Sequence, residues 1–205
     1  MRVLRVFAIL LLLQLSILFL ATSCCDELYT YQWSSLFVYN LDNRGENPQF
    51  SEETRFPAIA YGIGLSLDFE LVHNQPCFNG LVNSAYATSC EESYTPNDTI
   101  SDIRIYALSD FDESHPAGTP LSDYFAADKR RYVASYSSRE EKLAQAVPIS
   151  SFIEDHQQNN FYLFTDFDLF LLREPTLDSV FQFVVEVELV SQTVLIDTTE
   201  SVILY

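Results

Sequence analysis

Paired carboxylates are the residues of this sequence whose type and spacing best suit chemistry. In the segments expected to form strands, three pairs have one residue between their members: Asp68 and Glu70, Asp166 and Asp168, and Glu186 and Glu188. Two carboxylates at a suitable separation can hydrolyse a glycosidic bond. Each pair, however, occupies alternate positions of a segment whose other positions are apolar, as in a half-buried strand. The pairs therefore favour polar sheet surfaces over a carboxylate-dependent hydrolase.

A second group of acids could bind calcium. Asp110, Asp112 and Glu113 lie close together, and Asp123 follows. Hard oxygen ligands suit Ca²⁺, but the spacing lacks the ordered ligand positions of an EF-hand loop. Acidic side chains are mostly solvated in folded proteins. We expect an acidic surface loop here and no metal site.

Histidine and glycine motifs do not indicate catalysis either. The three histidines are scattered, and the sequence has neither an HExxH motif nor a GxSxG elbow. Gly62 and Gly64 lie inside an alternating segment with no third glycine and no helix after them, which excludes a nucleotide loop. They are typical of a bulge or of close approach by a neighbouring strand. We predict a non-enzymatic protein without a cofactor.

Aromatic residues recur at every second position near the start of the mature chain. Tyr29, Tyr31, Trp33, Phe37 and Tyr39 would share one face of a strand. An exposed face of this kind could stack on sugars, which makes Tyr29, Tyr31 and Trp33 candidate glycan-binding residues. A sheet needs one buried face, however, so the same pattern favours a core stripe.

Residues 1–23 have the layout of an export signal. Arg2 and Arg5 provide the positive end, an apolar run follows over residues 6–20, and small polar residues precede Cys24. The apolar run of about 15 residues is shorter than the roughly 20 needed to cross a bilayer as a helix. We therefore expect a leader that is removed and not a transmembrane anchor.

This segment resembles the lipobox of bacterial lipoproteins, with residues 20–23 placed before Cys24. The resemblance implies that a diacylglycerol is joined to the Cys24 thiol and that fatty acids such as palmitate acylate the freed amine. Several acyl chains make membrane attachment durable. Cys25 stands where an aspartate would resemble an inner-membrane retention signal. Asp26 and Glu27 resemble a short acidic signal for the outer face of the outer membrane.

Size and charge limit the classes of partner. Removal of the leader leaves residues 24–205, enough for a single domain with one hydrophobic core. The net charge of −18 becomes −20 when the two leader arginines are lost. Such a charge repels nucleic-acid phosphates and anionic lipid, so we expect no nucleic-acid binding and a body that stands off the membrane.

Cys77 and Cys90 lie in a long polar stretch of the mature chain. Export to an oxidising compartment makes a disulfide between them a candidate, and such a bridge would stabilise the loop by about 3 kcal/mol. Cys25 is left over, either free beside the membrane or paired with another molecule. Without a CxxC motif, these cysteines do not indicate a metal site.

Period-two alternation of apolar and polar residues dominates the mature chain. The expected strands are residues 28–41 (one strand or two short ones), 58–72, 100–108, 131–136, 161–171, 179–190 and 193–204. Two short helices are expected, over residues 138–144 with a capping-box start and over residues 149–156. No helix is long enough to cover a parallel sheet. The pattern predicts an all-β, antiparallel two-sheet sandwich that resembles the immunoglobulin and fibronectin type III folds in strand count and closing hairpin.

As a whole, the chain resembles small β-sandwich outer-membrane lipoproteins of unknown function from anaerobic Gram-negative bacteria. The resemblance is carried by Cys24-Cys25-Asp26-Glu27, by residues 31–43, and by residues 111–125 with their HPAGT motif. The triplet at Asp98-Thr99-Ile100 is similar to an O-glycosylation sequence of some of these bacteria, which makes Thr99 a candidate acceptor.

These observations predict an outer-membrane lipoprotein, either facing the periplasm or exposed on the cell surface. We expect it to act as a non-enzymatic binding or structural accessory module, with a surface glycan or an outer-membrane protein complex as its partner. A glycan-binding module that uses exposed aromatic residues is the alternative.

Overall fold

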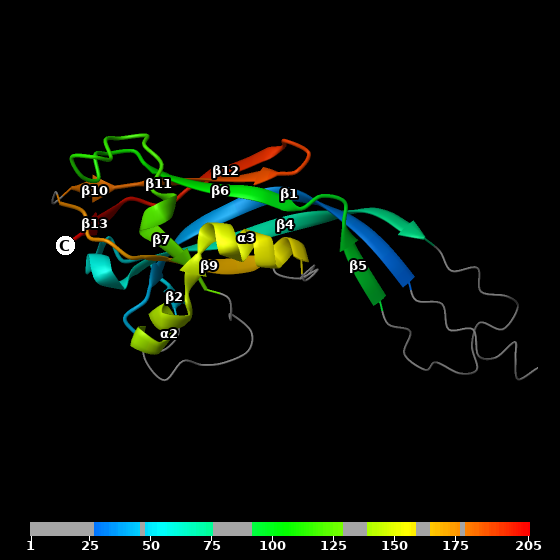
Figure 1. Ribbon diagram of the computed structural model, residues 1–205, viewed down its shortest axis with the longest axis horizontal. Helices are drawn as coiled ribbons and strands as arrows, with labels where there is room; N and C mark the ends of the chain where they lie inside the picture. The colour runs from blue at the N-terminus through cyan, green and yellow to red at the C-terminus, as the bar shows by residue number, and fades with distance from the viewer. Residues whose placement is uncertain (1–26, 46–47, 76–91, 129–138, 159–164, 177–178) are drawn as a thin grey trace, which may run out of the picture. The chain divides into compact units, whose positions relative to one another are not determined.

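A computed structural model describes residues 27–45, 48–75, 92–128, 139–158, 165–176 and 179–205 (Figure 1). The expected leader, Cys24, Cys25, Cys77 and Cys90 lie outside the described residues, as does the strand predicted over residues 131–136. The chain forms two compact units, residues 1–31 with 71–95, and residues 32–70 with 96–205. In the smaller unit β5 (Glu92–Pro96) pairs with β1, and the rings of Tyr29 and Tyr94 stack with centroids 5.1 Å apart.

The largest sheet has the strand order β2-β1-β4-β9-β7-β8. The strands in this order are β1 (Glu27–Asp42), β2 (Gln49–Phe50), β4 (Tyr61–Gln75), β7 (Phe125–Ala127), β8 (Val147–Pro148) and β9 (Asp166–Leu171), and β5 is the seventh strand of the sheet. β4 and β9 pair antiparallel, and β7 pairs antiparallel with both β8 and β9. The alternating segments at 28–41, 58–72 and 161–171 therefore supply its three longest strands.

A three-stranded sheet has the order β12-β11-β6, and all its pairs are antiparallel. Its strands are β6 (Ile100–Ala107), β11 (Phe183–Leu189) and β12 (Val194–Thr198). The predicted strand over 193–204 is wrong as one element, because the chain leaves this sheet after Thr198. Buried Thr199 holds the exit, since its N–H donates to the Phe183 oxygen at 2.9 Å.

A second three-stranded sheet has the order β10-β13-β3. Its strands are β3 (Arg55–Phe56), β10 (Val180–Phe181) and β13 (Val202–Leu204). β10 and β13 run antiparallel, whereas β13 and β3 run parallel. The last residues of the chain thus add a strand to this sheet, where the sequence predicted only a hairpin arm.

The core lies between the largest sheet and the β12-β11-β6 sheet. Alternate residues of β4 and β11 are fully buried: Tyr61, Ile63 and Leu65, with Phe183, Val185 and Val187, are all 0% exposed. The rings of Tyr61 and Phe183 stack across the two sheets with centroids 5.4 Å apart. Period-two alternation selected these faces, and the predicted all-β sandwich is confirmed.

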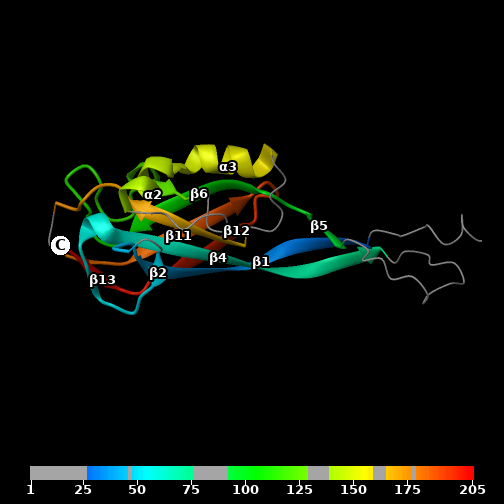
Figure 2. The ribbon, with the colours of Figure 1, turned by 90° about the horizontal axis from the view of Figure 1, so that it is seen from below.

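The two predicted helices are present as α2 (Arg139–Gln145) and α3 (Ile149–Gln158). α3 packs against β6, β7 and β8 through a face that includes buried Ile149 and Ile153 (Figure 2). Two short 3₁₀ turns, η1 (Ala58–Ala60) and η2 (Ser122–Tyr124), precede β4 and β7. Over the described residues, no helix combines the length and apolar character that a membrane crossing requires.

β1 does not keep one inward face along its length. Tyr31 and Trp33 are buried, but Leu36 is the next buried residue and Phe37 is 52% exposed. Trp33 and Leu36 are three positions apart, whereas residues on one face of a regular strand are separated by an even number of positions. The inward side of the strand therefore changes between them, as it does at a β-bulge. The prediction that Phe37 shares the face of Trp33 is therefore wrong.

Gly62 and Gly64 allow neighbouring groups to approach β4 closely. A side chain at Gly62 would meet the Leu169 oxygen of β9 at 2.9 Å, and one at Gly64 would overlap the ring of Tyr39. The predicted close approach is confirmed. Both glycines lie on the face of β4 opposite the core, and that face is covered at this point.

Candidate functional site

The aromatic residues of β1 do not form a sugar platform. Tyr31 is 1% exposed and Trp33 is 6% exposed, so neither ring offers a face to an external ligand. Tyr29 is half-buried and stacks on Tyr94. The glycan-binding role considered for Tyr31 and Trp33 is therefore corrected to a packing role, because the strand needs these rings for its buried side.

The carboxylate pairs differ from one another in their environment. Asp68 and Glu70 are exposed, as the alternation predicts. Asp168 is only 3% exposed, so its predicted solvated position is wrong. It lies opposite Gly64 on the covered face, where the Asp128 N–H donates to the Asp168 backbone oxygen at 2.9 Å. Asp128 is also buried, at 4% exposure.

Asp112 fixes the loop that follows β6. One carboxylate oxygen accepts hydrogen bonds from the Ser114 hydroxyl at 2.7 Å and from the Ser114 and His115 backbone N–H groups at 2.8 Å. The same oxygen lies 2.8 Å from His115 Nδ1, and the other accepts from the Tyr124 hydroxyl at 3.0 Å. These bonds, with the Ser114 hydroxyl first, hold the pKa of Asp112 well below its usual range.

This loop is not arranged for nucleophilic catalysis. Ser114 Oγ and Asp112 Oδ1 both approach the same ring nitrogen of His115, at 3.0 and 2.8 Å. A catalytic triad needs the histidine to bridge the serine and the acid through its two different nitrogens. The Asp110 carboxylate accepts the Ala117 N–H at 2.8 Å. The loop acids are therefore used to shape the backbone, and the described residues contain no group arranged to hold a metal ion.

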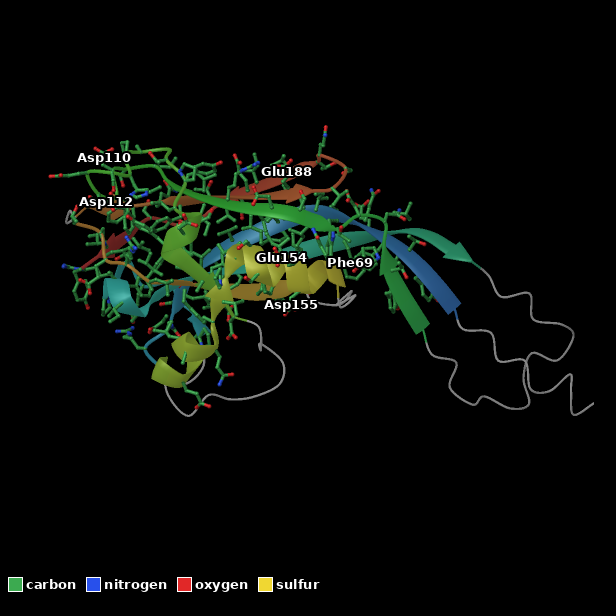
Figure 3. All side chains as sticks on the ribbon, in the orientation of Figure 1. Phe69, Asp110, Asp112, Glu154, Asp155 and Glu188 are labelled. Carbon is green, nitrogen blue, oxygen red and sulfur yellow. The ribbon has the colours of Figure 1, made fainter. Side chains whose placement is uncertain are left out.

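An ion-pair cluster lies on the outward face of the β12-β11-β6 sheet, at Glu188 in Figure 3. We call it the Arg104 cluster, and its members are Asp102, Arg104, Glu186 and Glu188. Arg104 Nε donates to Glu186 at 3.1 Å, and its Nη1 donates to Glu188 at 2.8 Å and to Asp102 at 3.4 Å. Three carboxylates share one guanidinium, so the cluster carries a net negative charge.

Exposed apolar side chains border the Arg104 cluster on β12. Val194 pairs with Glu188 and is 39% exposed, while Ile196 pairs with Glu186 and is 57% exposed. β12 is the last strand of its sheet. Sequence reasoning missed this edge because it treated residues 193–204 as one strand. The available signal was the run Val194-Leu195-Ile196, which contains neither a charged residue nor a proline.

Thr99 lies just before β6 and is half-exposed. Its backbone N–H donates to the Asp98 carboxylate at 2.9 Å, and its oxygen accepts the Val190 N–H at 2.9 Å. The backbone on both sides of the candidate acceptor is thus held in place, while its side chain is partly open to solvent.

Residues 34–200 match the family described as Domain of unknown function (DUF5034). The chain belongs to the DUF5034 family. The matched DUF5034 residues begin within β1 and include the Asp112 loop, the Arg104 cluster and β12. Neither a comparison with curated proteins nor one with solved structures finds a match to the chain.

Proposed function

We propose that this DUF5034 protein is a lipoprotein of the outer membrane, anchored through Cys24, whose β-sandwich is a non-enzymatic binding or structural accessory module. The observation that carries the proposal is the export-signal pattern of residues 1–23 directly before Cys24, with the first strand beginning three residues later at Glu27. A link this short between the lipid anchor and the domain favours a protein that functions within a surface assembly over one that ranges far from the membrane.

The charge and the described side chains support the same proposal. A mature net charge of −20 suits a protein body held at an anionic membrane by acyl chains and not by lipid headgroup contacts. The acids most suggestive of chemistry have structural partners, since Asp112 shapes a loop and Glu186 pairs with Arg104. Burial of Tyr31 and Trp33 leaves the glycan-binding alternative without its central rings.

A comparison of the two adjacent cysteines tests the anchor. The full chain, Cys24→Ser and Cys25→Ser would be expressed in a Gram-negative host and partitioned with a phase-separating detergent. We expect the full chain and Cys25→Ser in the detergent phase, and Cys24→Ser in the aqueous phase or uncleaved in the inner membrane. A mature Cys24→Ser protein that still enters the detergent phase would refute the anchor.

Membrane fractionation and protease treatment of intact cells then test the address. The protein should cofractionate with the outer membrane, and digestion of intact cells distinguishes surface exposure from the periplasmic face. Recovery with the inner membrane would refute the outer-membrane assignment.

A further inference from the structure

We propose that β12 is a docking edge for an extended segment of a partner protein, which adds to the sheet as a strand and whose side chains alternate between basic and apolar. This deepens the proposed function by naming the chemistry of the partner. It rests on the sandwich being a binding module, but it is independent of the anchor and of its test.

The hydrogen bonds of the hairpin show which backbone groups of β12 point outward. Leu189 N–H donates to the Thr193 oxygen at 2.8 Å, and Thr199 N–H donates to the Phe183 oxygen at 2.9 Å. Pairing alternates along an antiparallel ladder, so Leu195 and Asp197 direct their backbone groups toward β11. Val194, Ile196 and Thr198 therefore direct theirs away from the sheet, and we call these three residues the β12 edge.

No described residue pairs with the β12 edge. Natural sheets usually protect such an edge with lysine, proline, a bulge, an inward-pointing charge or a covering segment, and of these β12 has the inward-pointing charge of Asp197. Here the two exposed side chains of the edge are apolar. The strand has one charge, Asp197, whose carboxylate accepts the Val38 N–H of β1 at 2.7 Å. That contact occupies the edge of β1 and leaves the outward backbone groups of β12 open for an added strand.

Charge determines the side chains that such a strand should carry. On the outward face, its residues would lie beside Val194 and Ile196, with Glu188 and Glu186 in the next strand. Lysine and arginine fit this position because their apolar stems can cover the valine and isoleucine while their charged ends extend toward the acids. The Arg104 cluster has three carboxylates for one guanidinium, so an added cation improves its balance. Apolar residues would occupy the alternate positions.

A second copy of this chain is a poorer occupant. Pairing of two β12 edges would bring two Arg104 clusters, each net negative, toward one another, and each chain carries a net charge of −18 that becomes −20 without the two leader arginines. Like charges that face each other across an interface oppose association. A basic segment gains from the same charges that a second copy would have to overcome.

The proposal is tested with the purified mature chain in a non-ionic detergent. The same detergent can be used whether or not the chain carries a lipid. The probe is a fluorescent peptide of sequence TKVKVKT, measured by anisotropy beside TEVEVET and two TKVKVKT analogues N-methylated on alternate residues. We expect binding of TKVKVKT that weakens several-fold between low and high salt, and at least tenfold weaker binding of TEVEVET. In one of the two analogues the N-methyl groups replace the N–H groups that face β12. That analogue should bind at least tenfold more weakly than the other.

Protein variants locate the binding. Ile196→Pro removes an outward N–H at an edge position that tolerates proline, and should weaken peptide binding at least tenfold. Ile59→Asn is the control, since Ile59 is similarly exposed at 55% but lies on η1. If Ile196→Pro does not fold, the Glu186→Gln, Glu188→Gln double variant should weaken TKVKVKT binding several-fold.

Four peptide-binding results would overturn the proposal. They are no binding of TKVKVKT at millimolar concentration, equal binding of TEVEVET, equal binding of both N-methylated analogues, and full binding by every β12-edge and glutamate variant that folds. Self-association of the mature chain that Ile196→Pro abolishes would assign the edge to a second copy instead, and would equally overturn the basic-segment proposal.

Discussion

The β6 and β12 edges of the three-stranded sheet differ in how the chain covers them. At β6, Leu121 N–H donates to the Ile105 oxygen at 2.7 Å, and Gly118 N–H donates to the Ala107 oxygen at 2.9 Å. Gln157 of α3 donates to the Ile100 oxygen at 2.7 Å. β12 has no such cover among the described residues. The sandwich thus protects one edge with loop and helix, whereas no described residue pairs with the other.

The largest expected difference concerns isoleucines on the two edge strands. Ile105→Ala on β6 should lower the free energy of unfolding by about 2–5 kcal/mol, because Ile105 is fully buried in the core. Ile196→Ala on β12 should change it by less than about 0.5 kcal/mol, because Ile196 is exposed. Urea unfolding of both variants measures the difference, and equal losses would show that β12 is buried by something in solution.

A second difference concerns the hydroxyl groups beside each edge. The Ser122 hydroxyl accepts the Ile105 N–H at 3.3 Å and donates to the Ile103 oxygen at 3.2 Å. Ser122→Ala should therefore lower stability by about 1–2 kcal/mol. Thr198→Ala on the β12 edge should cost less than about 0.5 kcal/mol. Hydrogen exchange of the Ile105 amide should accelerate in Ser122→Ala alone; unchanged exchange would mean that the hydroxyl does not cover the edge.

Acid should weaken the β6 cover through Asp112, which fixes the loop that follows β6. Bonds from Ser114, His115 and Tyr124 lower the pKa of Asp112 in the folded protein. Its stabilising contribution is therefore present above the unfolded pKa of about 3.9, and is lost as the pH falls toward the lower folded pKa.

The matched variant is Asp112→Asn. It should be less stable than the native chain at pH 7, and this deficit should shrink as the pH falls below about 4, toward the lower folded pKa. Unfolding curves from pH 7 to pH 2 measure the deficit. A deficit that is the same at every pH would show that the Asp112 charge is not responsible.

The smallest expected effects on stability concern two residues with positive φ, one in the turn next to β6 and one in the turn next to β12. Gly118, at φ 77°, lies in the β6 cover, and Gln192, at φ 70°, lies in the β11–β12 turn. Gly118→Ala should cost about 1 kcal/mol, and Gln192→Gly should gain about 0.5–1 kcal/mol. Thermal unfolding measures both changes, and a loss in Gln192→Gly would mean that its side chain makes a contact worth more than the relieved strain.

Much of the fold could be predicted because its signals are local. Strict alternation in Tyr61–Leu67 and Phe183–Leu189 identified both core faces. The capping-box start and the flanking proline located α2 and α3 to within a few residues. Short two-residue strands such as β2, β3 and β10 have no comparable signal, because they arise only from pairing with distant segments.

The candidate docking edge could be predicted only in part. The Val194-Leu195-Ile196 run is visible as a strand, and its β11 partner follows from the hairpin. Its end at Thr198 was not predicted, because Val202 to Leu204 continue the apolar alternation in a different sheet. The burial of Asp168 was missed for a similar reason, since a covering layer on the second face leaves no mark on the periodicity of β9.

By itself, the sequence predicted a leader and an anchor at Cys24, and it determined the strand-rich character of the following chain and the apolar faces of its main strands. Tertiary structure alone decided that Trp33 is buried while Phe37 is exposed, and that described residues cover β6 but do not pair with the outer edge of β12. The reason is that alternation is a property of neighbouring residues, whereas an edge is covered or left open by contacts between distant ones. The Gln157–Ile100 bond spans 57 residues, and the Asp197–Val38 bond spans 159.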